Sequence, residues 1–106
     1  MKSFTPYYAV IFTTLRTEGD GGYTEMAGRM EALARVQPGF LGFETARDEV
    51  GISVSYWESL EDIARWKENA RHLEAQRMGR EKWYEHYTLR ICKVEREYSF
   101  DKPPEE

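Results

Sequence analysis

The chain has 106 residues, of which 41% are hydrophobic, 14% aromatic and 32% charged, a composition that fits a compact folded protein and excludes a disordered one. The net charge of −4 argues against nucleic acid as a partner, because phosphate binding needs clustered excess lysine and arginine. The length predicts one domain, residues 1–106, with a core of about 7–96 and an acidic, proline-containing tail at 101–106. A core of this size is modest, so dimerisation would help to stabilise it.

No stretch approaches the roughly 18 apolar residues of a membrane helix, and the N-terminal run lacks the pattern of a signal peptide. Cys92 is the sole cysteine, which excludes an intrachain disulfide and a thiol-rich metal site. A cysteine alone in a strand is usually a small buried residue. We therefore expect a cytoplasmic protein without a membrane partner, in which Cys92 is buried.

The first half of the chain predicts a strand, a helix and a hairpin. Residues 7–15 are β-branched and aromatic, and their apolar residues fall on both alternating faces, so both faces of this strand are expected to be covered. Residues 23–37 follow the spacing of an amphipathic helix, which the sequence Gln37-Pro38-Gly39 ends. Two further strands, 40–48 and 52–57, are joined by a turn at Val50 and Gly51.

The second half predicts a helix and a last strand. Ser59 and Asp62 match the N-terminal capping pattern of a helix, and Asn69 is expected to mark a break within it. A strand is predicted from about Tyr84 to Arg96. One helical stripe is apolar, and consists of Leu60, Ile63, Trp66, Ala70 and Leu73.

The charged residues between Glu61 and Glu85 balance, six basic against six acidic. Lys67 and Arg71 are among the basic ones. The balance predicts a solvated helical face with i,i+4 pairs.

The order strand, helix, strand, strand, helix, strand predicts a ferredoxin-like βαββαβ fold of the α+β class. This fold has a four-stranded antiparallel sheet with both helices on one face. The other face would be bare and apolar, which favours a homodimer with two sheets packed face to face as a dimeric α/β barrel. Tyr98 and Phe100 would extend the last strand onto the partner.

Several short motifs occur in the order found in a known family. They are PGFLGFE at 38–44, YWES from Tyr56, W-x5-H from Trp66 to His72, H-x3-Q and R-x-G-R after it, and WY before the last strand. Together they resemble the antibiotic biosynthesis monooxygenase family over about residues 7–96. The resemblance implies a dimeric α+β barrel with a cavity between the sheet and the helices of each subunit. In the quinone-forming members, that cavity carries out flavin-free and metal-free oxygenation of a phenolic polyketide.

The haem-degrading branch of the family uses a histidine on the second helical segment as iron ligand, a tryptophan nearby and an asparagine on the first strand. Trp66 matches the tryptophan, but the ligand position falls on Gln76, and the first strand contains no asparagine. Glutamine is not a credible axial ligand, so haem is possible but disfavoured. His72 and His86 are too far apart to form a metal site.

His72 and Gln76 are i,i+4 neighbours and would present an imidazole and an amide to the same space. We expect His72 to be the catalytic base that takes a phenolic proton from the substrate, after which the ring reacts directly with oxygen. The alternative is a structural histidine whose ring bonds backbone or solvent.

Four aromatic residues and one arginine are further candidates for the site. Trp66 is either a core residue or a wall of the substrate pocket. Trp83 is a candidate for substrate binding, and Tyr56 and Trp57 for further aromatic lining. Arg90 shares a strand face with Thr88 and Cys92, and would either bind an acidic or phenolate ligand or pair across the dimer.

The resulting hypothesis is a cofactor-independent monooxygenase of a small aromatic or quinol-like substrate, with molecular oxygen as co-substrate and neither flavin nor metal. The alternative is a non-catalytic, small-molecule binding or stress-associated module on the same fold, because fold does not determine chemistry. Haem binding or degradation is the second alternative.

Overall fold

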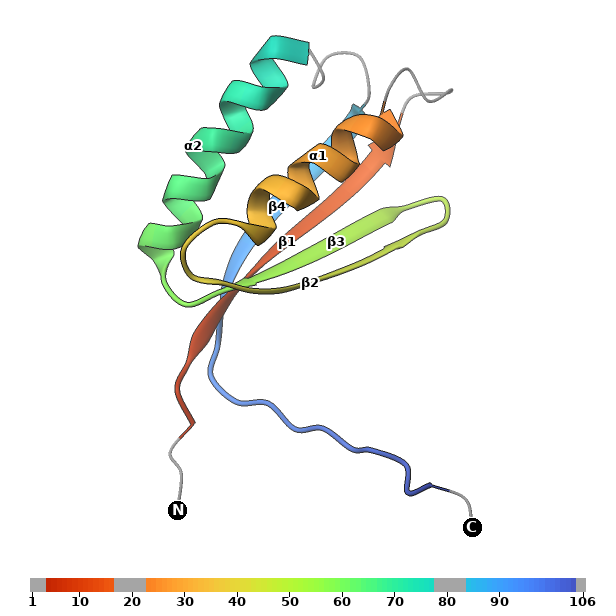
Figure 1. Ribbon diagram of the computed structural model, residues 1–106. Coiled ribbons are helices and arrows are strands. Elements are labelled where there is room, and N and C mark those ends of the chain that lie inside the picture. The colour runs from red at the N-terminus through yellow and green to blue at the C-terminus, as the bar shows by residue number, and fades with distance from the viewer. Residues whose placement is uncertain (1–3, 17–22, 78–83, 105–106) are drawn as a thin grey trace.

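The computed structural model describes the backbone of residues 4–16, 23–77 and 84–104, and the side chains of 4–15, 27–71 and 86–104. Four strands form one antiparallel sheet in the order β2-β3-β1-β4, and both helices lie on the same side of it (Figure 1). This arrangement confirms the predicted ferredoxin-like α+β fold. The elements are β1 (Tyr7–Arg16), α1 (Tyr23–Arg35), β2 (Phe40–Arg47), β3 (Gly51–Trp57), α2 (Leu60–Arg77) and β4 (Tyr84–Val94).

The elements of the first half lie within one or two residues of their predicted ends, and the second half differs from the prediction in α2 and β4. Helix α2 is continuous from Leu60 to Arg77, so the break expected at Asn69 is wrong. The side-chain amide of Asn69 donates a hydrogen bond of 3.1 Å to the side-chain oxygen of Gln37, which follows α1. Asn69 therefore links the two helices instead of ending one. Strand β4 ends at Val94, two residues before the predicted end.

The start of α2 is fixed by its cap and by a glycine turn. The Ser59 hydroxyl accepts a hydrogen bond from the Asp62 backbone N–H (3.1 Å) and donates one to the Asp62 carboxylate (2.8 Å). The first bond is the N-cap bond of the predicted pattern, and the aspartate that replaces the usual glutamate bonds the serine hydroxyl. Gly39 has a φ of +81°, and any Cβ there would collide with the Asp62 side chain. The turn before β2 therefore needs glycine for its conformation and for the close approach of α2.

The strand register decides which side chains face the helices. Val10 lies opposite Ile91, and both face the helices, whereas the adjacent Ile11 lies opposite Arg90 on the other face. Trp57, at the end of β3, is fully buried under α2. The buried core consists of Val10, Ala34, Trp57 and Ile63, with Tyr8, Phe40, Trp66 and Leu89 packed against it.

The sheet face away from the helices is uncovered in the single chain. Cys92 is exposed on this face, so its expected burial is wrong for one subunit taken alone. Ile52, on the same face, is 43% exposed. The segment 95–104 leaves β4 in an extended conformation and runs away from the body of the protein (Figure 1). It carries Tyr98 and Phe100, which are 88% and 84% exposed.

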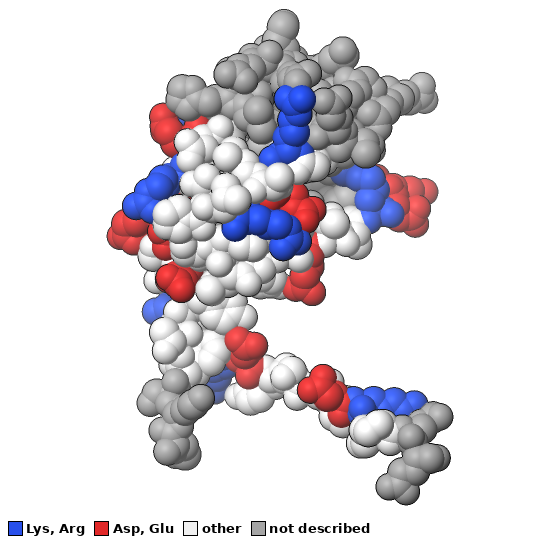
Figure 2. Space-filling view, viewed as in Figure 1, with Lys and Arg blue, Asp and Glu red and all other residues white. Residues whose placement is uncertain are grey.

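Basic and acidic side chains are interspersed on the face of the molecule seen in Figure 2. No helix of the described part of the chain is long and apolar enough to cross a membrane.

Candidate functional site

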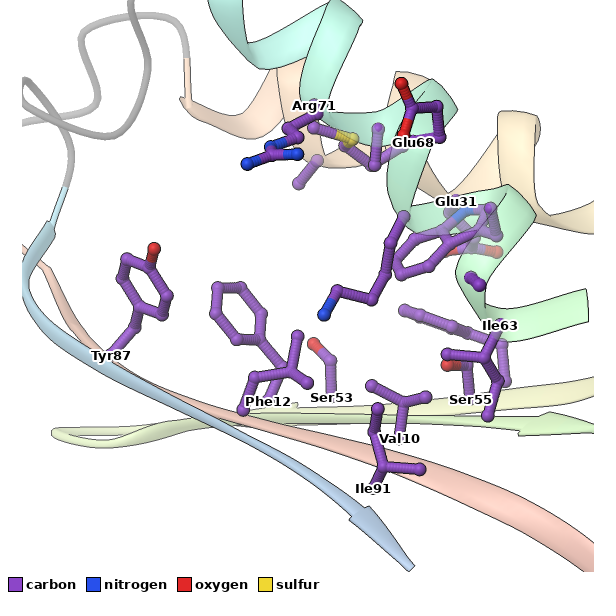
Figure 3. A pocket seen from close by; sticks show the side chains of 18 of the residues that line it. Val10, Phe12, Glu31, Ser53, Ser55, Ile63, Glu68, Arg71, Tyr87 and Ile91 are labelled. Atoms are coloured by element: carbon purple, nitrogen blue, oxygen red, sulfur yellow. The ribbon is translucent and has the colours of Figure 1, made fainter. Parts of the chain in front are cut away.

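A cavity of about 770 Å³ lies between the sheet and the two helices (Figure 3). Its position is the one that the family resemblance implies, and its volume is in the range of small-molecule sites, about 300–1,000 Å³. The described lining residues are Val10 and Phe12 of β1, Ala27, Met30 and Glu31 of α1, Phe43 of β2, Ser53 and Ser55 of β3, Leu60, Ile63, Ala64, Trp66, Lys67, Glu68, Ala70 and Arg71 of α2, and Tyr87, Leu89 and Ile91 of β4.

The floor of the cavity is apolar because every second residue of the central strands faces the helices. In Figure 3, Val10, Phe12 and Ile91 extend from the sheet toward the helices. The Phe12 ring lies 5.3 Å from the Tyr87 ring, measured between centroids, in an edge-on arrangement. The Tyr87 side chain rises from β4 with its hydroxyl group directed toward the helix side (Figure 3). A planar apolar ligand would therefore meet aromatic surface on the sheet side.

Two serine hydroxyls interrupt the apolar floor. The Ser55 hydroxyl accepts a hydrogen bond of 2.8 Å from the indole N–H of Trp57, and remains able to donate. The Ser53 hydroxyl lies 3.1 Å from the hydroxyl of Thr45. Both serines line the cavity and each already has one polar partner. They provide hydroxyl groups of fixed position to a bound molecule.

Trp66 is both a core residue and a wall of the cavity. Its ring packs on that of Trp57 with a centroid distance of 5.6 Å and an interplanar angle of 39°. Its indole N–H is buried, yet it has no hydrogen-bond partner within the described structure. A buried donor without an acceptor costs about 1–3 kcal/mol. An acceptor atom of a ligand or a water in the cavity would remove that cost.

The charged residues of the cavity come from the two helices. Glu31 of α1 already pairs with Arg35 at 2.8 Å. Glu68 and Arg71 of α2 lie on the helix side in Figure 3, and Lys67 also lines the cavity. The sequence assigned Lys67 and Arg71 to a solvated, internally paired helical face. Both side chains are exposed, as that assignment predicted, but they also border the cavity, and neither forms an ion pair within the part of the chain that the structure describes.

The structure describes the side chains of two of the five predicted site residues, and it brings one of these two to the cavity. Trp66 lines it. Arg90 lies on the opposite sheet face, paired with Ile11, and does not belong to the described lining. His72 and Gln76 fall within α2, but their side chains lie outside the described residues. Trp83 lies outside the described residues altogether, and the roles of all five in substrate binding or catalysis stay predictions.

Two of the other aromatic candidates do not line the cavity. Trp57 is fully buried beneath Trp66, and Tyr56 faces the opposite side of the sheet, where its hydroxyl donates a hydrogen bond of 2.7 Å to Glu44. The cavity contributions of Phe12 and Tyr87 were missed. Phe12 was recognisable as a strand residue, but only the register with β4 shows that it meets Tyr87.

The opposite sheet face carries a second group of polar aromatic side chains. The Tyr7 and Tyr56 rings lie 5.8 Å apart in an edge-on contact. The hydrogen bond to Glu44, together with burial and the negative charge of that carboxylate, raises the pKa of Tyr56 to about 12. Burial and a hydrogen bond to Glu97 raise the pKa of Tyr7. These groups are separated from the cavity by the sheet, so they do not act in it.

The fold and the cavity define a small ferredoxin-like α+β protein with a ligand-sized space between its sheet and its helices. The sequence matches the profile of the antibiotic biosynthesis monooxygenase family over residues 6–78. The chain therefore belongs to this family. YqjZ of Bacillus subtilis, an uncharacterized protein, is 48% identical over 99 residues, which cover 92% of this chain and 87% of the relative.

Two solved structures show the same fold. SnoaB of Streptomyces nogalater, described as a cofactor-independent oxygenase, has a TM-score of 0.64 at 11% identity and matches 93% of this chain and 100% of its own. A mutant of MhuD with two manganese protoporphyrin IX molecules bound per active site has a TM-score of 0.64 at 24% identity, and matches 88% of this chain and 99% of its own. At these identities the likeness concerns the fold alone.

Proposed function

We propose that this chain is a monooxygenase that reacts a small aromatic, quinol-like substrate with molecular oxygen and uses neither flavin nor metal. The observation that carries the proposal is the cavity of about 770 Å³, whose walls include the rings of Phe12, Trp66 and Tyr87. Such a space accommodates a planar molecule of a few fused rings. Membership of the antibiotic biosynthesis monooxygenase family supports a monooxygenase-like role.

The proposed reaction begins with removal of a phenolic proton from the substrate. The resulting phenolate raises the electron density of the ring, which permits direct reaction with oxygen. Oxidation of the ring CH para to the phenolic oxygen by one O₂ converts both carbons to carbonyls of a quinone and releases one water, so atoms and electrons balance without a further reductant. His72 is the proposed base. It follows Arg71, which lines the cavity, in the same helix.

Three hydrogen-bonding groups on the cavity wall support a phenolic substrate. The Trp66 N–H has no partner in the described structure and would donate to a substrate oxygen. The hydroxyls of Ser53 and Ser55 lie on the floor of the same space (Figure 3). An apolar cavity with a few convergent polar groups is the usual form of a small-molecule site.

The family resemblance suggests haem as a cofactor, because one branch of the family degrades haem. Among the described residues, the cavity wall contains no histidine, which is the iron ligand of the haem-degrading branch. Gln76 occupies the corresponding sequence position. The proposed reaction therefore contains no step that involves haem.

Oxygen consumption tests the proposal. Purified, metal-stripped protein is incubated with naphthols, anthrones and quinols, with and without air, while an electrode follows oxygen and absorbance follows the product. We expect uptake above that of buffer and of boiled protein. Tight binding of the same compounds without uptake would instead identify a binding module. A Soret band with turnover of added haem would identify the haem-degrading alternative.

We also propose a cytoplasmic homodimer in which the uncovered sheet faces of two subunits pack together. Support comes from the exposed apolar residues of this face, such as Ile52, and from the outlying Tyr98 and Phe100. Burying these side chains against a second copy would remove them from water and stabilise a chain of modest core size.

A further inference from the structure

Two basic residues of α2 lie one helical turn apart on the cavity side. Lys67 and Arg71 both line the cavity, and their i,i+4 spacing places them side by side on the helix. Neither forms a salt bridge with a carboxylate within the described part of the chain. In contrast, Arg65 of the same helix pairs with Asp62 at 3.1 Å, and Arg35 of α1 pairs with Glu31 at 2.8 Å. The cavity wall therefore carries two cationic groups that have no carboxylate in ion-pair contact among the described residues.

The carboxylates of the cavity wall are Glu31 and Glu68. Glu31 is engaged by Arg35, and Glu68 lies beside α2 on the helix side of the cavity (Figure 3). The Arg71 side chain extends from α2 toward the end of the cavity that is lined by Tyr87 (Figure 3). Arg71 is therefore placed where a molecule lying on the sheet floor would present its edge, and Lys67 lines the same cavity.

The Trp66 indole N–H adds a third donor to the same wall. It is buried and has no acceptor in the described structure, and it comes from the residue directly before Lys67. An anionic oxygen is the strongest acceptor that an N–H, an ammonium or a guanidinium group can meet. A neutral hydrocarbon would leave the buried Trp66 N–H unsatisfied and would give the two basic groups no anionic partner.

We propose that the cavity selects planar aromatic molecules that carry a carboxylate, with Lys67 and Arg71 binding the carboxylate and the apolar floor binding the rings. This inference rests on the proposed aromatic-binding function and specifies its substrate class. Both basic side chains reach solvent, so water and salt screen their charge. We expect a preference of about tenfold for a carboxylated ligand over its neutral analogue, a difference of about 1.4 kcal/mol.

Calorimetric binding of 2-naphthol and 3-hydroxy-2-naphthoate tests this preference without any need for turnover. The full-length protein should bind the carboxylated compound about tenfold more tightly at low ionic strength, and added salt should reduce the difference. Lys67→Gln and Arg71→Gln should each lower the preference, and the double variant should abolish it, so that the two compounds bind with similar affinity. Arg65→Gln is the matched control, because it removes one positive charge from the same helix away from the cavity.

Two results would overturn the inference. Equal affinity of the unmodified protein for both compounds would show that the cavity does not recognise the carboxylate, even if oxygen uptake had established the proposed function. A preference that persists in the double variant would show that Lys67 and Arg71 do not bind the carboxylate, and one that Arg65→Gln removes equally would show that it does not depend on the position of the charge along the helix. Binding of neither compound would count against the proposed function itself. Circular dichroism would confirm that each variant is folded.

Discussion

Two tryptophans whose rings are in contact can each be replaced by phenylalanine. The two variants distinguish an indole with a structural role from one that faces a ligand. Trp57 and Trp66 are in ring contact, but their N–H groups differ. That of Trp57 donates to Ser55 at 2.8 Å, and that of Trp66 is buried without a partner in the described structure. The same substitution therefore removes a satisfied donor at one position and an unsatisfied one at the other.

The expected costs follow from this difference. At Trp57, loss of the indole's additional buried area costs about 1–2 kcal/mol, and loss of the hydrogen bond to the buried Ser55 adds about 1 kcal/mol. We expect Trp57→Phe to lower the free energy of unfolding by about 2–3 kcal/mol. At Trp66, which is only partly buried, a loss of about 1 kcal/mol is offset by removal of the unpaired donor. Trp66→Phe should change the free energy of unfolding by less than about 1 kcal/mol.

Urea denaturation followed by circular dichroism measures both values, and calorimetry measures naphthol binding by the two variants. Trp66→Phe should weaken binding of a phenolic ligand several-fold, because one hydrogen bond contributes about 0.5–1.5 kcal/mol. Trp57→Phe should leave binding nearly unchanged under conditions where it is folded. The reasoning fails if Trp66→Phe destabilises the protein as much as Trp57→Phe, which would mean that the Trp66 N–H is already satisfied. It also fails if Trp66→Phe has no effect on binding.

Three further predictions concern the base, the opposite sheet face and the C-terminal segment. His72→Ala should lower oxygen uptake by a factor on the order of 10² to 10⁴, and an unchanged rate would remove His72 from the mechanism. The raised pKa of Tyr56 favours the protonated phenol in the folded state, so its stabilising contribution is complete below pH 10 and is lost as the pH rises toward 12. A ¹³C NMR titration of Glu44→Gln should show the Tyr56 pKa falling toward 10; no change would contradict the assigned cause. Phe100→Ser should shift the proposed dimer toward monomer in light scattering at low concentration, and a variant as dimeric as the unmodified chain would exclude Phe100 from the interface.

The element order could be predicted because each element has a local signal. The Ser59 cap, the apolar stripe of α2 and the alternation of β3 are set by neighbouring residues, and each is found in the structure. Asn69 was misread because asparagine is a weak helix former. Its side chain bonds Gln37, 32 positions away, and no local pattern contains that contact.

The site was harder to predict because it depends on which sheet face the helices cover. In β1, Val10 and Ile11 are both apolar, so alternation alone does not distinguish the two faces. The register with β4 does so, and it assigns Ile91 to the cavity and Arg90 to the opposite face. Equal numbers of acidic and basic residues in α2 also suggested that these residues pair with one another. A count from the sequence does not show which charges lie within ion-pair distance.

The apolar character of both faces of β1 has a physical explanation in the position of this strand. β1 lies between β3 and β4, so neither of its edges is free and its side chains make up the middle of both sheet surfaces. Phe12 borders the cavity on one side, and Ile11 belongs to the face for which we propose a second subunit. A polar residue at Phe12 would weaken ligand contacts and leave the other face unchanged, whereas one at Ile11 would act on subunit association. One strand would thus serve catalysis and assembly through alternate residues, which explains why its sequence lacks the apolar and polar alternation of a strand with one face in water.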